Sequence, residues 1–272
     1  MNDSHSIPST GDHTPGTGDH AVVVTRVSDT EWHAMDGDQV VGCGDASVRP
    51  DGRLFVGIDA WHGEVFARVA EAMTADLPAP LYAVADETDR DSVSAWQRAG
   101  FTTVRREWGY VVPTDPQVTG LGPVRPPAGV VVVPVGQAEE APLRALDQVL
   151  HAEIEAGPGW QAMPAQVLPC PAGTTVVDPS KYAVARQAGR YVGLLRLAPL
   201  TRQPRIGLIA VRADLQRHGI ARALLADTLD ALHRRGTASV WAEVTESNAA
   251  ATALFEGIGA RRAGSTLEFV RR

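Results

Sequence analysis

The sequence has little cysteine, no long apolar run and no excess of positive charge, and each of these absences excludes a class of protein. Its 272 residues include two cysteines, Cys43 and Cys170, which lie far apart and in no metal-binding spacing. We therefore expect neither a disulfide framework nor a metal site, and a reducing compartment is the default. The formal net charge of −7 argues against a nucleic-acid binder, whose footprint would be basic.

Targeting features are also missing. No apolar run approaches the roughly 18–20 residues that a membrane span needs. The start of the chain, Met1–Ser6, has neither the basic beginning nor the apolar stretch of a secretory signal. These observations predict a cytoplasmic protein without a membrane partner, present as a monomer or a homodimer.

Composition changes along the chain predict two folded blocks. Residues 1–20 contain polar residues, glycine and proline, so we expect a disordered tail. Residues 114–129 are rich in proline and glycine, which is typical of a stiff linker. The remaining residues form a first domain over 21–113 and a second domain over 130–272.

Hydrophobic periodicity predicts an α/β order in the second block. The spacing of leucines and alanines predicts helices over 139–155 and 220–235, and a short helix after Asn248. Apolar stretches predict the intervening strands, over 130–133, 182–187, 190–197, 206–211, 240–244 and 267–270.

The first block repeats this order in a shortened form. Its segment Arg53–Ala60 matches Arg205–Arg212, and Trp96–Phe101 matches Phe255–Ala260. These matches indicate an internal duplication of one α/β unit. The first copy has no equivalent of the 139–155 helix.

The segment Val211–Arg222 carries the chemistry. A strand enters a turn whose glycine, Gly219, opens a helix, so free backbone N–H groups and the positive helix end point at one place. Gly219 allows close approach of a phosphate, and Arg217 and Arg222 add positive charge. The segment therefore predicts an anion-binding loop.

Two motifs in the second block resemble those of the GNAT N-acetyltransferase superfamily. Gln216–Ala221 is similar to the signature Gln/Arg-x-x-Gly-x-Gly/Ala. The family's second signature, Asn…Ala…Leu-Tyr…Gly, is similar to the set Asn248, Ala251, Leu254, Phe255 and Gly259. The resemblance spans the second block, and the first block resembles a degenerate copy. It implies two tandem GNAT-like α/β units, each with a mixed, mostly antiparallel sheet flanked by helices.

The resemblance implies acetyl-coenzyme A as the donor and direct transfer of the acetyl group to an amine. The implied cofactor-binding residues are Ile209, Ala210, Val211, Gln216, Arg217, His218, Gly219, Ile220, Ala221, Arg222, Asn248 and Phe255. Phe255 stands where the family has a tyrosine that protonates the leaving thiolate. A phenyl ring cannot donate a proton, so packing in the core is the simpler interpretation of Phe255.

An alkyl amine needs help to lose its proton at neutral pH, so the reaction favours a general base. The strand before the loop, 206–211, has no glutamate at the place where the family often has one. Glu243, on the neighbouring strand, is the candidate base, and Trp241 shares its face. A structural carboxylate remains the alternative interpretation of Glu243.

Other candidate residues have simpler interpretations as solvated or core side chains. They are His151, Glu153 and Glu155 on the helix expected to wall the substrate pocket, His218 in the loop, the two cysteines, and the six tryptophans. The acidic balance favours a small cationic acceptor, such as a polyamine or an amino sugar. A protein N-acetyltransferase and a non-catalytic acyl-coenzyme-A-binding module remain the alternatives.

Overall fold

A computed structural model describes residues 21–49, 51–122, 124–157, 163, 177–198 and 203–272. The predicted tail over 1–20 lies outside these residues. The described strands form one sheet, in the order β1-β2-β3-β4-β5-β12-β6-β11-β10-β9-β8-β7. Only the pairs β4–β5 and β10–β11 are parallel, which confirms the expected mixed and mostly antiparallel sheet flanked by helices.

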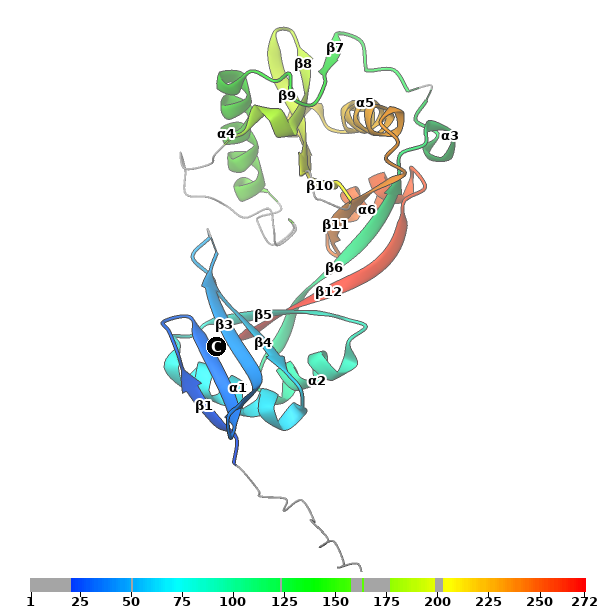
Figure 1. Ribbon diagram of the computed structural model, residues 1–272. Helices are drawn as coiled ribbons and strands as arrows, with labels where there is room; N and C mark the ends of the chain where they lie inside the picture. Colours follow the sequence, from blue (N-terminus) through cyan, green and yellow to red (C-terminus); the bar gives the residue numbers. More distant parts are fainter. Residues whose placement is uncertain (1–20, 50, 123, 158–162, 164–176, 199–202) are drawn as a thin grey trace, which may run out of the picture.

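The first half of the chain supplies six strands and two helices (Figure 1). They are β1 (Val23–Arg26), β2 (Glu31–Asp36), β3 (Gln39–Val48), β4 (Leu54–Ala60), α1 (Gly63–Asp76), β5 (Leu81–Asp86), α2 (Arg90–Arg98) and β6 (Thr102–Pro113).

The described residues of the second half form the other six strands and four helices. They are α3 (Pro116–Thr119), β7 (Val130–Val133), α4 (Glu140–Ala156), β8 (Tyr182–Gln187), β9 (Arg190–Ala198), β10 (Arg205–Val211), α5 (Ile220–Arg234), β11 (Ser239–Thr245), α6 (Ala249–Glu256) and β12 (Arg261–Arg271). Short 3₁₀ turns at Pro179–Lys181 and Ala213–Leu215 precede β8 and α5.

The sequences Asp36-Gly37-Asp38 and Ala188-Gly189 predict two hairpin turns, and both have a clear backbone basis. Gly37, with φ of 56°, joins β2 to β3. Ala188 and Gly189, with φ of 47° and 77°, join β8 to β9. Two successive residues with positive φ are the signature of a turn that matches the twist of a hairpin, so this prediction is confirmed.

The halves exchange their last strands, which no sequence pattern predicts. The last strand of the first half, β6, pairs with β11 of the second half. The pairing covers the whole of β11, from Ser239 to Thr245. The C-terminal strand β12 pairs with β5 of the first half, and β6 and β12 also pair with each other. Figure 1 shows these two long strands running from one half of the molecule into the other.

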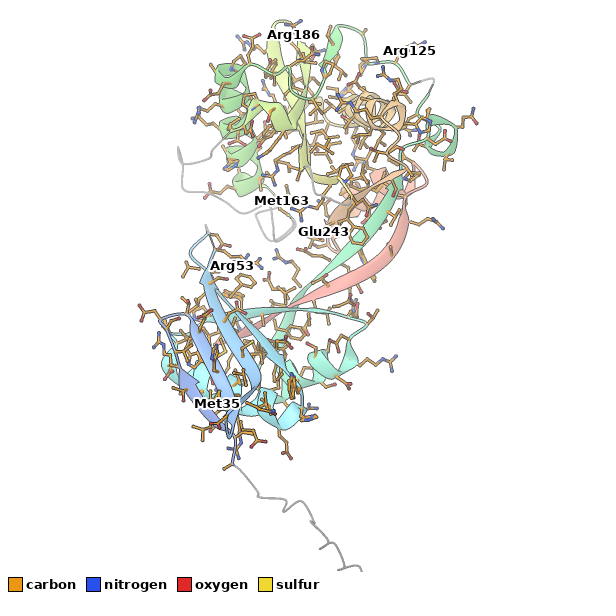
Figure 2. All side chains as sticks on the ribbon, viewed as in Figure 1. Met35, Arg53, Arg125, Met163, Arg186 and Glu243 are labelled. Carbon is orange, nitrogen blue, oxygen red and sulfur yellow. The ribbon has the colours of Figure 1, made fainter. Side chains whose placement is uncertain are left out.

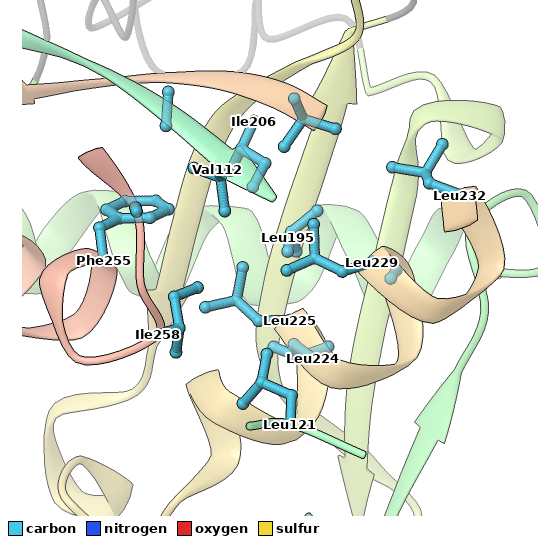
Figure 3. Close-up of a cluster of buried hydrophobic side chains, with 14 of the residues drawn as sticks. Val112, Leu121, Leu195, Ile206, Leu224, Leu225, Leu229, Leu232, Phe255 and Ile258 are labelled. Carbon is cyan, nitrogen blue, oxygen red and sulfur yellow. The ribbon is translucent and has the colours of Figure 1, made fainter. Parts of the chain in front are cut away.

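The exchange is also visible in the hydrophobic cores. Val112 of β6 lies in the cluster formed by α5, α6 and the second-half strands (Figure 3). Phe269 of β12 lies in the cluster formed by α1, α2 and the first-half strands. A third cluster packs α4 on the opposite face of β8 and β9 from α5. Each half therefore needs a strand of the other to complete its core.

Three details differ from the sequence-based expectations. The apolar spacing of Trp61, Val65 and Val69 predicts that Trp61 lies on the buried face of a helix, but Trp61 precedes α1 and is 67% exposed, so that prediction is wrong. Trp108 of β6 packs against the second-half cluster rather than the first, because of the strand exchange. The segment expected to be a linker contains α3, and its Leu121 is buried in the second-half core.

No helix in the described part of the chain combines the length and the hydrophobicity that crossing a bilayer requires.

Replacing Phe269 should destabilise the first-half core although the residue lies near the C-terminus. Phe269 has no exposed surface, so Phe269→Ala should lower the free energy of unfolding by about 3–5 kcal/mol. Urea unfolding measures this loss. The control Val104→Ala, at a residue that is 47% exposed on β6, should change it by less than about 0.5 kcal/mol. Equal effects of the two changes would contradict the strand exchange.

Candidate functional site

The site begins where two parallel strands separate. β10 and β11 pair only at Arg205 with Trp241 and at Ile206 with Ala242. The register of β10 then shifts between Ile206 and Leu208, while its pairing with β9 continues to Val211. The two strands diverge beyond the shift, so the edge of β10 that faces β11 carries backbone groups with no strand partner. A ligand with amide groups can pair with such an edge.

The loop after β10 is shaped to hold an anion. Gly219 is the N-cap of α5, with φ of 85° and no side-chain capping hydrogen bond. Arg217, two residues earlier, also has a positive φ of 65°. This backbone leaves the first N–H groups of α5 without a capping side chain, and they point together with the positive helix end at one place. The loop therefore has the backbone geometry expected of an anion-binding loop.

A cavity of about 980 Å³ opens between the diverging strands, this loop and the start of α6. Ten of the twelve residues predicted to bind the cofactor line it: Ile209, Ala210, Val211, Gln216, Arg217, Gly219, Ile220, Ala221, Arg222 and Asn248. The other two do not. His218 is an exposed loop residue, and Phe255 lines a smaller neighbouring pocket. The sequence motifs thus converge on one cavity wall.

Asn248 shapes the far side of the cavity through the helix that it begins. Its Oδ1 accepts a hydrogen bond of 3.0 Å from the backbone N–H of Ala251. This is the N-cap contact that the sequence predicts for α6. The first turn of α6 therefore faces the first turn of α5 across the cavity.

Glu243 lies in the smaller pocket, of about 40 Å³, beside the point where β10 and β11 separate (Figure 2). Its Oε1 accepts a hydrogen bond of 3.1 Å from Trp241 Nε1, and its Oε2 lies 3.6 Å from a guanidinium nitrogen of Arg205. The side chain is 23% exposed. Two partners thus hold the carboxylate in this small pocket, and Trp241 shares its face as expected.

Phe255 is 3% exposed, and its ring stacks on Tyr110 at 6.0 Å between centroids. The Tyr110 hydroxyl is hydrogen bonded to Glu256 and Arg262 and lines neither cavity. Phe255 has no hydroxyl, and the hydroxyl of Tyr110 lies outside the cavity. Phe255 packs in the core between the pocket and β6.

Two residues of the cavity wall make contacts that the sequence does not predict: Glu153, for which a solvated side chain is the simpler expectation, and Met163. Glu153 of α4 accepts a hydrogen bond of 2.8 Å from the backbone N–H of Ala213, at the start of the anion loop. Met163 lines both the large cavity and the pocket that holds Glu243 (Figure 2). Only a contact map reveals these roles, because the partners are far away in the sequence.

The remaining candidate residues lie outside this cavity or outside the described residues. His151 pairs with Asp147 at 3.6 Å, and Glu155 is exposed. Cys43 is an exposed thiol in the first half. Cys170 and Trp160 lie outside the described part of the chain. Among the described residues, no group of three or more His, Cys, Asp or Glu side chains is arranged to hold a metal ion.

The absence of a side chain at Gly109 leaves room for the Trp241 ring beside Glu243. A Cβ at Gly109 would lie 2.2 Å from the Trp241 ring, so Gly109→Ala should displace the ring and cost about 1–3 kcal/mol of stability. Urea unfolding followed by tryptophan fluorescence measures both effects. The control is Gly264→Ala. Gly264 of β12 pairs with Gly109 of β6, but it has open space around it. Equal stability losses in the two variants would contradict this packing.

Comparison with known proteins agrees with the geometry. Residues 148–260 match the model of the acetyltransferase (GNAT) family. A stretch of 51 residues is 55% identical to the ribosomal protein bS18-alanine N-acetyltransferase of Escherichia coli K12, and covers 19% of this chain and 34% of that relative. The chain thus matches about a third of the relative's length.

Two solved structures resemble nearly the whole fold. A GCN5-related N-acetyltransferase from Sphaerobacter thermophilus has a TM-score of 0.63 at 16% identity, over 91% of this chain and 82% of that one. A tandem GNAT protein from the clavulanic acid biosynthesis pathway has a TM-score of 0.62 at 16% identity, over 89% and 82% of the two chains. At this identity the likeness is one of fold. Residues 148–260 thus match the GNAT acetyltransferase family, and the fold of nearly the whole chain resembles that of a tandem GNAT protein.

Proposed function

We propose that the second half of the chain transfers an acetyl group from acetyl-coenzyme A to an amine. The observation that carries this proposal is the convergence of an unpaired strand edge and an uncapped helix start on one cavity. A coenzyme A molecule offers the matching groups, which are the amides of its pantetheine arm and its pyrophosphate. The shape of the cavity and its chemistry thus support the same ligand.

The donor is held by backbone groups more than by side chains. The backbone from Gln216 to Ala221 holds the pyrophosphate, with Arg217 and Arg222 adding positive charge. Ile209, Ala210 and Val211 offer their main-chain groups to the pantetheine arm and the thioester, and Asn248 contacts the arm from the side of α6. Gly219 keeps the loop free of a side chain at the phosphate.

The acceptor amine reaches the thioester from the side of Glu243. Removing the proton from an alkyl ammonium group with a pKa near 10.4 costs about 4.6 kcal/mol of free energy at pH 7. Glu243 takes that proton, directly or through a water, while Trp241 and Arg205 hold its carboxylate in place. The neutral amine attacks the thioester carbonyl and forms the carbon–nitrogen bond, the carbon–sulfur bond breaks, and the thiolate of coenzyme A leaves. The nitrogen then releases its extra proton to solvent, which leaves the neutral amide.

The leaving thiolate receives no proton from Phe255. A thiol with a pKa near 8.5 is a tolerable leaving group, so solvent can supply this proton after the bond breaks. The reaction therefore needs a protein group to deprotonate the amine, but none to protonate the leaving thiolate.

We propose a small cationic amine as the acceptor, because the net charge of −7 attracts such molecules through the field of the protein. The partial match to a ribosomal-protein alanine N-acetyltransferase favours a second candidate, the α-amine of a protein N-terminus.

Mass spectrometry of the reaction products tests both acceptors. The protein is incubated with acetyl-coenzyme A and spermidine, glucosamine or an alanine-initiated peptide. Acetylated product supports the enzyme, whereas thermal stabilisation by acetyl-coenzyme A without any product would indicate a binding module.

Gly219→Glu should abolish cofactor binding. The new side chain places a negative charge at the phosphate position and strains a residue with positive φ. Acetyl-coenzyme A should raise the melting temperature of the natural protein but not of this variant. The control is Gly189→Glu, which has a positive φ of 77° and open space in a distant hairpin. A shift retained in Gly219→Glu would contradict this assignment of the loop.

Glu243→Gln should slow transfer without weakening donor binding. Loss of the base should lower kcat/KM for the amine by about 100-fold or more, and less at high pH, where more amine is neutral. Glu246→Gln, at an exposed carboxylate just after β11, serves as the control. Steady-state assays between pH 7 and 10 measure both. Unchanged activity in Glu243→Gln would exclude this residue as the base.

The first half should not bind coenzyme A. Its equivalent loop consists only of Trp61 and His62 between β4 and α1, where the second half has 212–219. Glu64 in the first turn of α1 would repel a phosphate at that helix start. Isothermal titration should therefore give a stoichiometry near one acetyl-coenzyme A per chain. A value near two would refute the prediction.

A further inference from the structure

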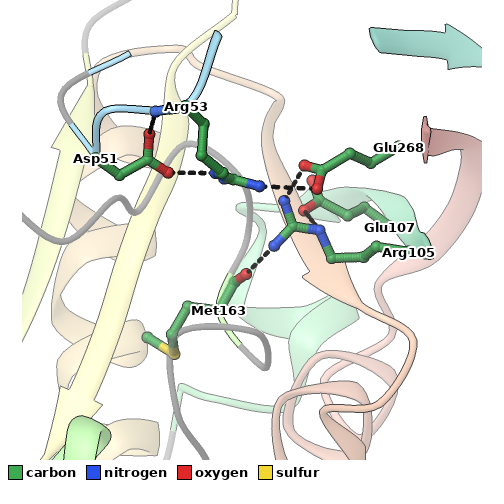
Figure 4. Close-up of polar contacts among 6 residues, drawn as sticks. All are labelled: Asp51, Arg53, Arg105, Glu107, Met163 and Glu268. Atoms are coloured by element: carbon green, nitrogen blue, oxygen red, sulfur yellow. Dashed lines mark hydrogen bonds and ion pairs between the residues drawn. The ribbon is translucent and has the colours of Figure 1, made fainter. Parts of the chain in front are cut away.

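Three buried charges occupy one face of the two exchanged strands (Figure 4). Arg105 lies on β6 between Glu107 of the same strand and Glu268 of β12. The three side chains are between 5% and 9% exposed. Glu268 also accepts a hydrogen bond of 2.8 Å from Arg53, which follows the turn between β3 and β4. This network connects the first half to the middle of the shared sheet.

The network also contacts the cavity wall of the second half. Nη1 of the Arg105 guanidinium donates a hydrogen bond of 3.2 Å to the main-chain carbonyl of Met163. Met163 is 9% exposed and lines both the 980 Å³ cavity and the pocket that contains Glu243. A residue of the first half is therefore in direct contact with the wall shared by the donor cavity and the pocket of the proposed base.

We propose that Arg105 is a positioning residue for the site in the second half. By holding the Met163 carbonyl, it fixes the wall beside which the thioester and the amine meet. The first half thus contributes to the reaction through a residue that binds no cofactor and takes part in no proton transfer. The inference rests on the proposed acetyl transfer.

The chemistry of arginine suits this role. A guanidinium has five donors in a rigid fork, so it can engage two carboxylates and one carbonyl at the same time. Glu268 and Glu107 satisfy the charge of Arg105, which leaves the third contact directed at Met163. On the other side of Glu268, burial disfavours the charged form of Arg53, but its contacts with Asp51 and Glu268 outweigh burial and raise its pKa. The carboxylate is therefore held from two sides.

Methionine methyl groups offer a direct test. The chain has four methionines, Met1, Met35, Met73 and Met163, so a spectrum of the 13C-methyl-methionine protein contains few signals. Met73 is fully buried in the first-half core and reports whether that half is folded. Met163→Leu assigns the signal of Met163. Acetyl-coenzyme A should shift the Met163 signal and leave that of Met73 unchanged.

In Arg105→Gln, the Met163 signal should move toward the position of an unstructured methionine before any ligand is added, while Met73 stays in place. The dissociation constant for acetyl-coenzyme A should change by less than about threefold, because the anion loop is intact. Transfer to the amine found in the product screen should lose about tenfold in kcat/KM, the effect of one lost hydrogen bond to a charged group. If Arg105→Gln displaces Met73, the triple variant Arg105→Gln, Glu107→Gln, Glu268→Gln removes all three buried charges and repeats the measurement.

Arg53→Gln is the matched control, because it also removes a cation from Glu268 but has no contact with Met163. It should leave the Met163 signal and the kinetics as they are in the natural protein. An unchanged Met163 signal in Arg105→Gln, or an equal displacement in Arg53→Gln, would overturn the proposal. Absence of acetylated product from the natural protein would instead refute the proposed function, and the methyl signals would still show whether Arg105 holds Met163.

Discussion

The antiparallel pairing of β6 with β12 is the interaction on which the rest of the structure depends. These two strands lie side by side at the centre of the sheet, and each completes the sheet and the core of the half to which it does not belong in sequence. Without the two exchanged strands, β5 and β11 would become open edges, and the two cores would lose Val112 and Phe269. The two halves therefore form one continuous sheet.

This shared sheet supports two units that differ where their parallel strands separate. In both, a parallel pair separates after two residue pairs, β4 from β5 and β10 from β11. Neither helix start has a side-chain cap, but only the second unit follows that opening with a long loop and a glycine N-cap at positive φ. In the first unit a carboxylate, Glu64, occupies the first helical turn instead. The same backbone opening thus borders the large cavity in the second unit and is followed by a short loop in the first.

Local sequence patterns predicted most elements of both halves, because turn glycines, caps and helical periodicity act over a few residues. The anion loop and Asn248 were predictable for the same reason, since the backbone chemistry of each lies within one short segment. The exchange of β6 and β12 was not, because both strands have the same alternating pattern whichever neighbour they pair with. Trp61 was misplaced because periodicity does not mark where a helix begins. Met163 and Glu153 reach the cavity through contacts with residues distant in sequence.

Hydrogen–deuterium exchange with and without acetyl-coenzyme A tests the central claim most directly, because it locates the bound cofactor on the chain. The account predicts slower exchange of the amides at 209–211 and 216–222 and in the first turn of α6, where the strand edge and the helix starts face the cavity. It predicts no change at 58–66, the corresponding segment of the first half. Protection of 58–66 equal to that of 216–222, or no protection at 209–211, would contradict it.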